Sequence, residues 1–252
     1  MTFFGSTRPL VFAHRGGITL GLENTLPTFD AGMKAGADGL ELDVHLSADG
    51  IVVVHHDRTL GRTARGAGPI AAKTAAELSP LGVPTLRDVL RRYPEARIIV
   101  EMKEDRAELG EAVAREARAA DAVGRVCAAG FGKAAVVAVR RTLPEMATSA
   151  HQEEVRRALH RTWMHWPIRS CAWQGYQVPE CAGWLRVVSP RFVKYAHLAG
   201  LKVQVWTVDE ESDMRRLLDW GVDALISNRP ALAVSVRDDW VSGAQDQAAV
   251  RS

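Results

Sequence analysis

Four ionisable residues stand at alternating positions of two apolar segments. Glu41 and Asp43 lie two residues apart in one segment, and Glu101 and Lys103 lie two apart in the other. Because side chains alternate along a strand, each pair would point to one face, about 6 to 7 Å apart along the chain. Three carboxylates in an apolar setting need compensation, which a bound cation supplies. Oxygen-only ligands favour a hard ion, so we expect Glu41, Asp43 and Glu101 to bind one Mg²⁺ or Ca²⁺.

Two histidines are expected beside this cation. His14 ends an apolar segment near the N-terminus. A hairpin folded about Asp49 would pair Asp43 with His55 and bring His56 close to the acidic residues. Two imidazoles beside one cation suit general base and general acid catalysis near neutral pH. His14 and His56 are therefore the candidate catalytic residues.

Positive charge is expected at the same place. Arg15 is followed by two glycines, which would give a phosphate a bidentate donor and close approach of the backbone, and Lys103 adds a second cation. A phosphate ester fits the whole set. The cation and the basic groups would stabilise charge on the phosphoryl oxygens, one histidine would deprotonate the attacking oxygen, and the other would protonate the departing one.

Each residue also has a structural interpretation. The carboxylates could face solvent or pair with arginines, either histidine could be a hydrogen-bonded core residue, and Arg15 or Lys103 could merely neutralise an acid. His45 and His55 are expected to point away from the site and are not assigned to catalysis. The joint pattern favours catalysis, because coincidence would have to place all of these types at strand ends in one small region.

Short apolar segments separated by stretches of helical spacing would position these residues. This pattern predicts an α/β protein with a parallel sheet. The expected strands are residues 10–14, 40–46, 97–103, 126–129, 146–149, 185–188, 203–207 and 224–227. Eight βα units in 252 residues predict a TIM (β/α)8 barrel, in which sites lie at the carboxyl ends of the strands. A doubly wound sheet is the alternative.

One irregularity interrupts the βα spacing. The turn Ala48-Asp49-Gly50 is followed by a β-branched run, which predicts a hairpin rather than a crossover. We therefore expect one barrel domain over residues 1–252, with a hairpin return and small insertion at 47–84 after the second strand. The small, polar residues 241–252 predict a mobile tail.

Composition excludes several other classes of protein. The formal net charge is +2 and no long basic run occurs, which argues against nucleic acid as a partner and favours a small-molecule substrate. Three cysteines without C-x-x-C spacing indicate neither a disulfide framework nor a zinc site, so a cytoplasmic protein is expected. No apolar run is long enough to predict export or a transmembrane segment. The sequence does not indicate the oligomeric state.

Several strings, in order, resemble the glycerophosphodiester phosphodiesterases. They are His14-Arg15-Gly16, Glu23-Asn24-Thr25, Glu41-Leu42-Asp43-Val44, Val54-His55-His56-Asp57 with Leu60 and Arg62-Thr63, Glu101-Met102-Lys103, Val205-Trp206-Thr207-Val208 and the closing 223–230. Their order and spacing together are highly specific. Gly130-Phe131 and Ser227-Asn228 depart from the strings that the family usually shows, Ser-Phe and Thr-Asp.

The resemblance implies a metal-dependent enzyme that releases an alcohol from a glycerophosphodiester and leaves sn-glycerol 3-phosphate. It implies a TIM barrel, a divalent cation on Glu41, Asp43 and Glu101, His14 and His56 as the acid/base pair, and Arg15 and Lys103 on the phosphate. We place Trp206 against the glycerol moiety, with a packing role as the alternative. Attack by water and attack by the substrate's own 2-hydroxyl, through a cyclic phosphate, are both open.

Other functions stay open beside this one. A lysophospholipase D-like hydrolase of lipid headgroups would share the chemistry, as would a nuclease, although the sequence lacks a basic track. A non-catalytic phosphodiester-binding protein would have lost one of the site residues. The aromatic-rich segment 163–184 either packs a core or forms a rim for a choline-like cation or acyl chain.

Overall fold

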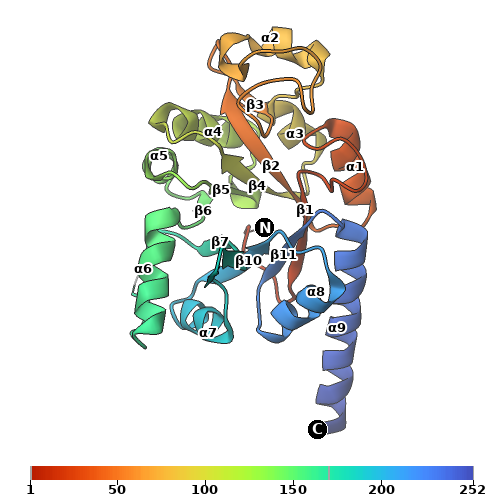
Figure 1. Ribbon diagram of the computed structural model, residues 1–252, viewed down its shortest axis with the longest axis vertical. Helices are drawn as coiled ribbons and strands as arrows, with labels where there is room; N and C mark the ends of the chain where they lie inside the picture. Colours follow the sequence, from red (N-terminus) through yellow and green to blue (C-terminus); the bar gives the residue numbers. More distant parts are fainter. Residues whose placement is uncertain (1, 170, 252) are drawn as a thin grey trace.

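The computed structural model describes residues 2–169 and 171–251 and shows a nearly closed barrel of eight parallel strands (Figure 1). The strand order around the barrel is β6-β5-β4-β2-β1-β11-β10-β7. The barrel strands are β1 (Leu10–His14), β2 (Gly39–Leu46), β4 (Arg97–Met102), β5 (Val126–Ala129), β6 (Ala147–Thr148), β7 (Gly175–Pro179), β10 (Lys202–Trp206) and β11 (Ala224–Ser227). The predicted TIM-barrel fold is confirmed.

The seam between β6 and β7 completes the circle. A single parallel bridge joins Ser149 to Gly175 there, and the amide of Ala150 donates to the Gly175 carbonyl over 2.9 Å. The other neighbouring strands share longer ladders, six residue pairs between β2 and β4 for example. The barrel is therefore least firmly closed between β6 and β7.

Helices cover the outside of the barrel (Figure 1). They are α1 (Leu26–Lys34), α3 (Leu86–Arg92), α4 (Ala107–Ala119), α5 (Lys133–Thr142), α6 (Gln152–Trp163), α7 (Pro190–Leu198), α8 (Glu211–Asp219) and α9 (Pro230–Arg251). Among the described residues, each helix is too short or too polar to cross a lipid bilayer.

The strand side chains alternate between the helices and the barrel interior. Leu40 and Leu42 of β2 point outward into a core formed with α1, α3, α4 and α5, whereas Ile99 of β4 packs inside the barrel with Phe12. Phe3 stacks on Phe12 in the same interior cluster. Toward the carboxyl ends of β2 and β4, the inward positions carry acidic residues instead. This end of the barrel, its mouth, is therefore charged.

The predicted sixth strand is wrong. The barrel strand is β7, Gly175–Pro179, whereas Leu185–Arg186 is β9 in a separate two-stranded hairpin with β8 (Cys181–Ala182). The β-branched pair Val187 and Val188 suggested a strand there, but both are buried in the core that α6 to α9 share, just before α7 begins. Glycine, glutamine and proline in β7 hid its strand character from a hydrophobic pattern.

The predicted hairpin has the predicted register. β3 (Val52–Val54) runs antiparallel to β2 with Val44 opposite Val54, and the amide of His55 donates to the Asp43 carbonyl over 2.9 Å.

Beyond the hairpin, residues 57–84 form a small excursion above the barrel (Figure 1). It contains α2 (Ala75–Leu78) and the short 3-10 turns η1 (Ile70–Ala72) and η2 (Ser79–Leu81). Leu60, Ile70, Leu78 and Val83 pack with Val53 into a separate apolar cluster. One domain over 1–252 with an insertion at 47–84 remains our proposal.

A mobile tail over residues 241–252 stays a prediction. The backbone continues as α9 to Arg251, and the side chains of residues 244 and 246–252 lie outside the described residues. The three cysteines are free, as their spacing predicted.

A tight contact between α1 and the turn after β1 positions His14 and Arg15. Gly32 of α1 is buried, and a Cβ added there would lie 2.4 Å from the Gly16 carbonyl oxygen and 2.9 Å from the Ala13 Cβ. Only a glycine lets the helix approach the turn this closely.

We expect Gly32→Ala to destabilise the protein even though alanine favours helix by about 1 kcal/mol. Overpacking against the turn should lower the free energy of unfolding by about 1 to 3 kcal/mol, measured by urea denaturation. Gly243→Ala on α9 is the control, because its Cβ would meet nothing within 4 Å. Equal or higher stability of Gly32→Ala would show that the contact is not tight.

Candidate active site

Three carboxylates converge at the mouth of the barrel. The strand register sets His14 opposite Glu41 and Asp43 opposite Glu101, so β1, β2 and β4 bring their charged residues to the same end of the barrel. One oxygen from each of Glu41, Asp43 and Glu101 lies within 4.8 Å of the others. Glu41 and Asp43 are buried, with 3% and 1% of their surface exposed. The structure brings together the three residues that the sequence predicted as a cation site.

This arrangement is electrostatically unfavourable on its own. Burial raises the pKa of Glu41 well above its usual range, and the charges of Asp43 and Glu101 raise it further. The backbone amide of Arg15 donates to Glu41 over 3.0 Å and offsets part of the cost. A bound divalent cation would offset much more, and an all-oxygen donor set suits a hard ion. The residues therefore fit a Mg²⁺ or Ca²⁺ site.

Two cations and an amide surround Asp43. Lys103 Nζ lies 3.3 Å from Asp43 and 2.9 Å from Glu101, and the Asn24 amide donates to Asp43 over 2.8 Å. Arg15 Nε lies 3.2 Å from Asp43 without the geometry of a hydrogen bond. Burial alone would lower the pKa of Lys103, but Glu101 and Asp43 outweigh it and raise that pKa, so the ammonium is retained.

The turn that carries Arg15 has an unusual backbone. Arg15 has φ +51°, and Gly16 and Gly17 follow at +91° and +95°. Three successive residues in the left-handed region reverse the chain directly after β1, which aims the Arg15 amide at Glu41. The guanidinium of Arg15 also pairs with Glu23 over 3.2 Å.

His14 is held in one tautomer by Asn228. The Asn228 amide nitrogen donates to Asp209 over 2.7 Å, so its oxygen faces His14 Nδ1 at 2.7 Å. An amide oxygen only accepts, and the proton therefore lies on Nδ1 and leaves Nε2 free. Burial lowers the pKa of His14, so the ring is neutral at pH 7 and Nε2, 3.8 Å from Glu41, can accept a proton.

His56 is oriented in a similar way by its neighbour. Its Nδ1 lies 2.7 Å from an Asp57 oxygen, which fixes the ring. Arg62 donates to Asp57 over 2.6 Å and lowers the pKa of this carboxyl, so Asp57 stays ionised. Arg62 also donates to Glu23, the partner of Arg15. His56 is 28% exposed and faces the same cavity as His14.

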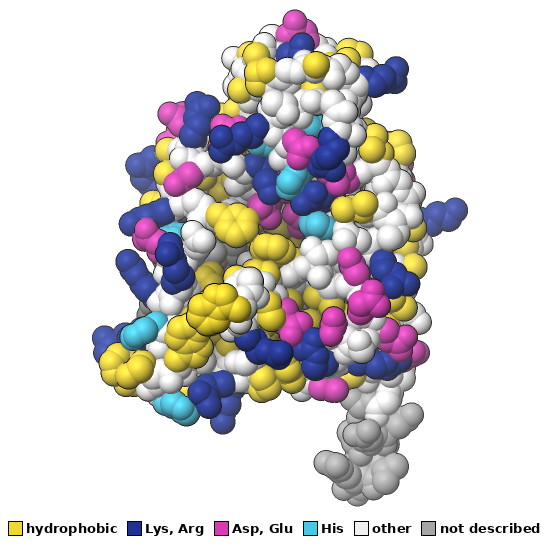
Figure 2. All heavy atoms as spheres, viewed as in Figure 1, with side chains coloured by type: hydrophobic (Ala, Val, Ile, Leu, Met, Phe, Trp, Pro, Cys, Tyr) yellow, Lys and Arg dark blue, Asp and Glu magenta, His cyan; other side chains and the backbone are white. Residues whose placement is uncertain are grey.

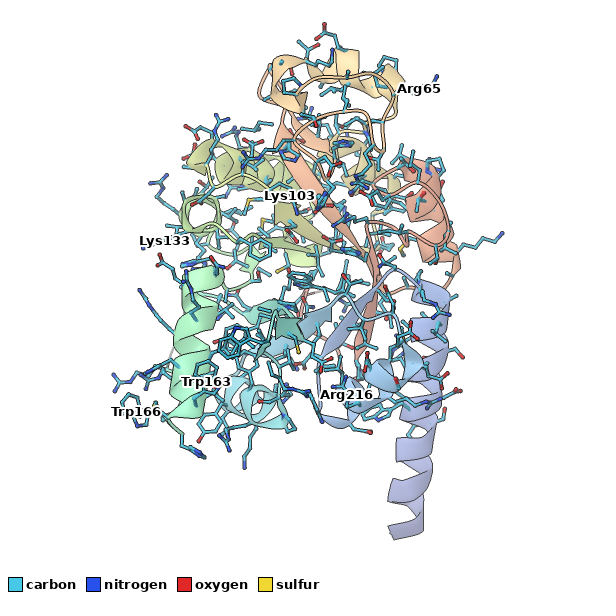
Figure 3. The ribbon with its side chains drawn as sticks, in the orientation of Figure 1. Arg65, Lys103, Lys133, Trp163, Trp166 and Arg216 are labelled. Atoms are coloured by element: carbon cyan, nitrogen blue, oxygen red, sulfur yellow. The ribbon has the colours of Figure 1, made fainter. Side chains whose placement is uncertain are left out.

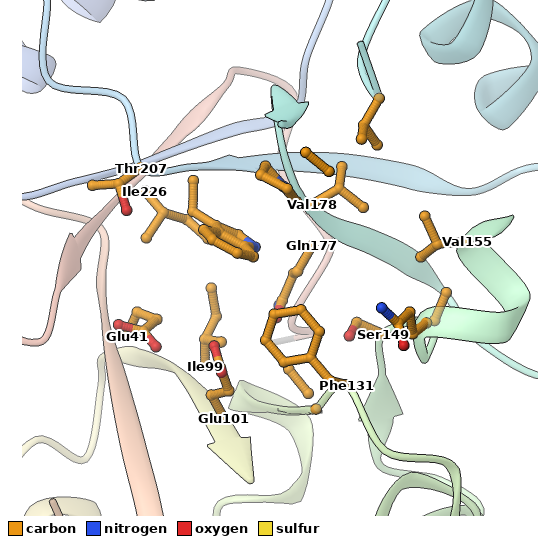
Figure 4. A pocket seen from close by; sticks show the side chains of 18 of the residues that line it. Glu41, Ile99, Glu101, Phe131, Ser149, Val155, Gln177, Val178, Thr207 and Ile226 are labelled. Carbon is orange, nitrogen blue, oxygen red and sulfur yellow. The ribbon is translucent and has the colours of Figure 1, made fainter. Parts of the chain in front are cut away.

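The predicted site residues share one cavity of about 500 Å³. His14, Arg15, Glu41, His56, Glu101, Lys103 and Trp206 line it, and Asp43 lies directly behind. Figure 2 shows acidic, basic and histidine side chains gathered in the middle of one face, with apolar side chains directly below them. In Figure 4, Glu41 and Glu101 stand together at one side of the cavity.

Trp206 borders the cavity beside another ring. It lies at the end of β10, and its centroid is 6.0 Å from that of Phe131 in an edge-to-face contact. Both packing and substrate contact are compatible with this position.

The aromatic side chains of segment 163–184 lie in several different environments. Tyr176 is fully buried and Trp173 packs against the same core, whereas Trp163 and Trp166 lie at the end of α6, away from Lys103 (Figure 3). Trp184 is 96% exposed. None of these five described residues lines the cavity. The core interpretation holds for Trp173 and Tyr176 only.

Several supporting residues were missed by the sequence analysis as site residues: Glu23, Asn24, Asp57, Arg62, Asp209 and Asn228. All are polar residues within or beside the strings that resemble the phosphodiesterases. Their types therefore signalled a role, but their partners are set by the fold.

The chain matches the glycerophosphoryl diester phosphodiesterase family over residues 14–232. A glycerophosphodiester phosphodiesterase of Caldanaerobacter subterraneus is 27% identical, with 91% of this chain and 98% of that protein covered. A probable glycerophosphodiester phosphodiesterase of Mycobacterium tuberculosis is 29% identical, with 92% of each covered.

Solved structures show the same similarity. A putative glycerophosphoryl diester phosphodiesterase of Silicibacter pomeroyi is 25% identical with a TM-score of 0.77, covering 92% of this chain and 94% of that one. An Oleispira antarctica phosphodiesterase in complex with the product sn-glycerol-3-phosphate is also 25% identical, with a TM-score of 0.72 over 93% and 99%.

We expect Glu41→Gln to stabilise the cation-free protein. The folded state holds a proton on Glu41 more tightly than the unfolded state, so stability falls as pH rises above the ordinary titration range of glutamate. A neutral amide removes this penalty, and its oxygen can still accept from the Arg15 amide. In chelator at pH 7, urea denaturation should give a free energy of unfolding higher by on the order of 1 kcal/mol.

The matched control for this prediction is Glu108→Gln. That side chain is 67% exposed, so its stability should change by no more than about 0.5 kcal/mol. A Glu41→Gln variant that is less stable than wild type in chelator would contradict the electrostatic description of the acidic residues.

Mg²⁺ or Ca²⁺ is expected to stabilise the wild-type protein and to have little effect on Glu101→Gln. An ion at a hundred times its dissociation constant adds about 2.7 kcal/mol, which corresponds to roughly 5 to 10 °C in melting temperature. Thermal unfolding after removal of metals with chelator measures the shift, with Glu108→Gln as the control. Stabilisation by Zn²⁺ alone would contradict the assignment to a hard cation.

Proposed function

The chain belongs to the glycerophosphoryl diester phosphodiesterase family, and from this membership we propose that it hydrolyses glycerophosphodiesters to an alcohol and sn-glycerol 3-phosphate. One observation carries the proposal: a single cavity is lined by two histidines, two acidic residues of the candidate cation site and two cations, His14, His56, Glu41, Glu101, Arg15 and Lys103. The product in the Oleispira antarctica structure supports the substrate class.

In the proposed reaction, water is added across a phosphorus–oxygen bond. A hydroxyl ends on phosphorus and a proton ends on the departing alcohol oxygen. One of His14 and His56 takes the proton from the attacking oxygen, and the other gives a proton to the oxygen that leaves. Asn228 and Asp57 hold the two Nδ1 atoms, so both rings work through Nε2. Attack by the substrate's 2-hydroxyl would use the same two rings, followed by hydrolysis of the cyclic phosphate.

Charge at the phosphate would be stabilised by Arg15 and Lys103. Both side chains are largely buried, with 18% and 19% exposed, so their charges are weakly screened. A divalent cation held by Glu41, Asp43 and Glu101 would polarise the non-bridging oxygens when bound. We place the glycerol moiety against Trp206, which borders the cavity.

We propose a small-molecule substrate, and nucleic acid is not expected as a partner because the formal net charge is only +2. A cytoplasmic location stays a prediction that rests on the three free cysteines.

His14→Ala and His56→Ala are each expected to lower kcat by roughly 10² or more, the range of general acid–base catalysis. The assay supplies a panel of glycerophosphodiesters with Mg²⁺ or Ca²⁺ and detects glycerol 3-phosphate enzymatically. His160→Ala is the control, because this exposed residue of α6 does not line the cavity. Wild-type turnover in a folded His14 or His56 variant would remove that residue from the mechanism.

A further inference from the structure

The cavity extends beyond the charged residues into an apolar arm. This arm is lined by Val155 and Leu159 of α6, Val178 of β7, Ala182 and Leu185 of the β8–β9 hairpin, and Val187. Figure 4 shows how the lining residues follow one another across the cavity. Glu41 and Glu101 lie at one side, Phe131 and Gln177 lie between, and Val155 lies at the far side. A substrate bound at the carboxylates would therefore reach an apolar space without leaving the cavity.

Two α6 positions give the arm a continuous wall. Val155 and Leu159 are four residues apart, so they lie one above the other on the same helix face. Leu185 projects from the hairpin to line the same space. Val155, Ala182 and Leu185 supply most of the open apolar surface, because Leu159, Val178 and Val187 are nearly buried behind them. Such surface beside a polar site marks a place where a ligand excludes water, at roughly 25 cal/mol for each Å² covered.

Charge in the arm disfavours a cationic headgroup. Among the described residues that line the cavity, the only carboxylates are Glu41 and Glu101, at the charged side. The arm has one ionisable lining residue among those described, Arg156 of α6, which follows Val155 in the chain. A choline or ethanolamine group would find a guanidinium there and no acid, whereas an uncharged hydrocarbon chain would meet matching surface.

The chain's own side chains leave the arm open. Trp184, the largest side chain of the hairpin, lies between Ala182 and Leu185 at its tip. Trp184 is 96% exposed, whereas its two small or aliphatic neighbours line the cavity. The hairpin thus forms a wall of the arm without plugging it.

We propose that the apolar arm binds one hydrocarbon chain of the substrate, so that the preferred substrates are glycerophosphodiesters that carry a single chain. This inference rests on the proposed phosphodiesterase function and specifies its substrate class. The chain is attached either to the glycerol, as in a lysophospholipid, or to the alcohol that leaves. Both share the chemistry that the arm recognises, a phosphodiester at the charged side and a methylene chain beyond it.

Two chain-length series test the inference. One is glycerophosphocholine with its 1-acyl derivatives of increasing length, and the other is glycerol phosphodiesters of n-alkanols, all below their micelle concentrations. In one series kcat/KM should rise about two- to fourfold for each added methylene until the arm is full. Release of lysophosphatidate or of an alkanol identifies which end carries the chain.

Variants connect this preference to the arm. The readout is a ratio: kcat/KM for the best chain-bearing substrate divided by kcat/KM for its chainless parent. Leu185→Glu and Val155→Glu should each lower this ratio by at least tenfold. Leu185→Met should keep the ratio, because methionine is apolar and of similar size. Leu198→Glu is the control on α7, where the side chain is 74% exposed and does not line the cavity.

The outcomes separate this inference from the proposed function. A flat chain-length dependence in both series, with glycerol 3-phosphate released, would overturn the apolar-chain inference and leave the function standing. No hydrolysis of any substrate with Mg²⁺ or Ca²⁺ would overturn the proposed function itself. If both glutamate variants fail to fold, the wild-type series still decides.

Discussion

The cost of holding three carboxylates together in a low-dielectric barrel mouth governs this site. Glu41 is buried beside Asp43 and Glu101, and its raised pKa records that cost. Arg15 and Lys103 lie where they reduce it, one through a backbone amide and the other through an ammonium. In the proposed function, the same two residues carry the positive charge that faces the phosphate. Repulsion among the carboxylates thus lowers the free energy of unfolding, and binding of a cation or a substrate would raise it again.

Two hydrogen-bond networks orient His14 and His56 beside the carboxylates. One runs from His14 through Asn228 to Asp209 and ties β1 to the end of β11. The other runs from His56 through Asp57 to Arg62, which lies in the excursion above the barrel. Arg62 reaches back to Glu23 and so to Arg15. The excursion therefore takes part in the site, because its Arg62 holds the partner of His56 and shares Glu23 with Arg15.

Local patterns predicted what depends on local geometry. Alternation placed Glu41 and Asp43 on one face, and the turn at Asp49 gave a hairpin register in which His55 is bonded to Asp43. The partner of His14 could not be predicted, because Asn228 lies 214 residues away and only the closed barrel brings it near. The apolar arm was also missed. It is built partly on β7, whose glycine, glutamine and proline concealed a strand, and on the β8–β9 hairpin, whose second strand was predicted as part of the barrel.

The seam between β6 and β7 has the shortest ladder of backbone pairs in the barrel. A single bridge from Ser149 to Gly175 closes it, and Ser149 also lines the cavity. Local opening costs least where a ladder is shortest, so we expect the wall beside the arm to open more readily than β1 and β2 on the opposite side of the circle. The wall that would adapt to a substrate chain is thus separate from β1, β2 and β4, the strands that hold the charged residues.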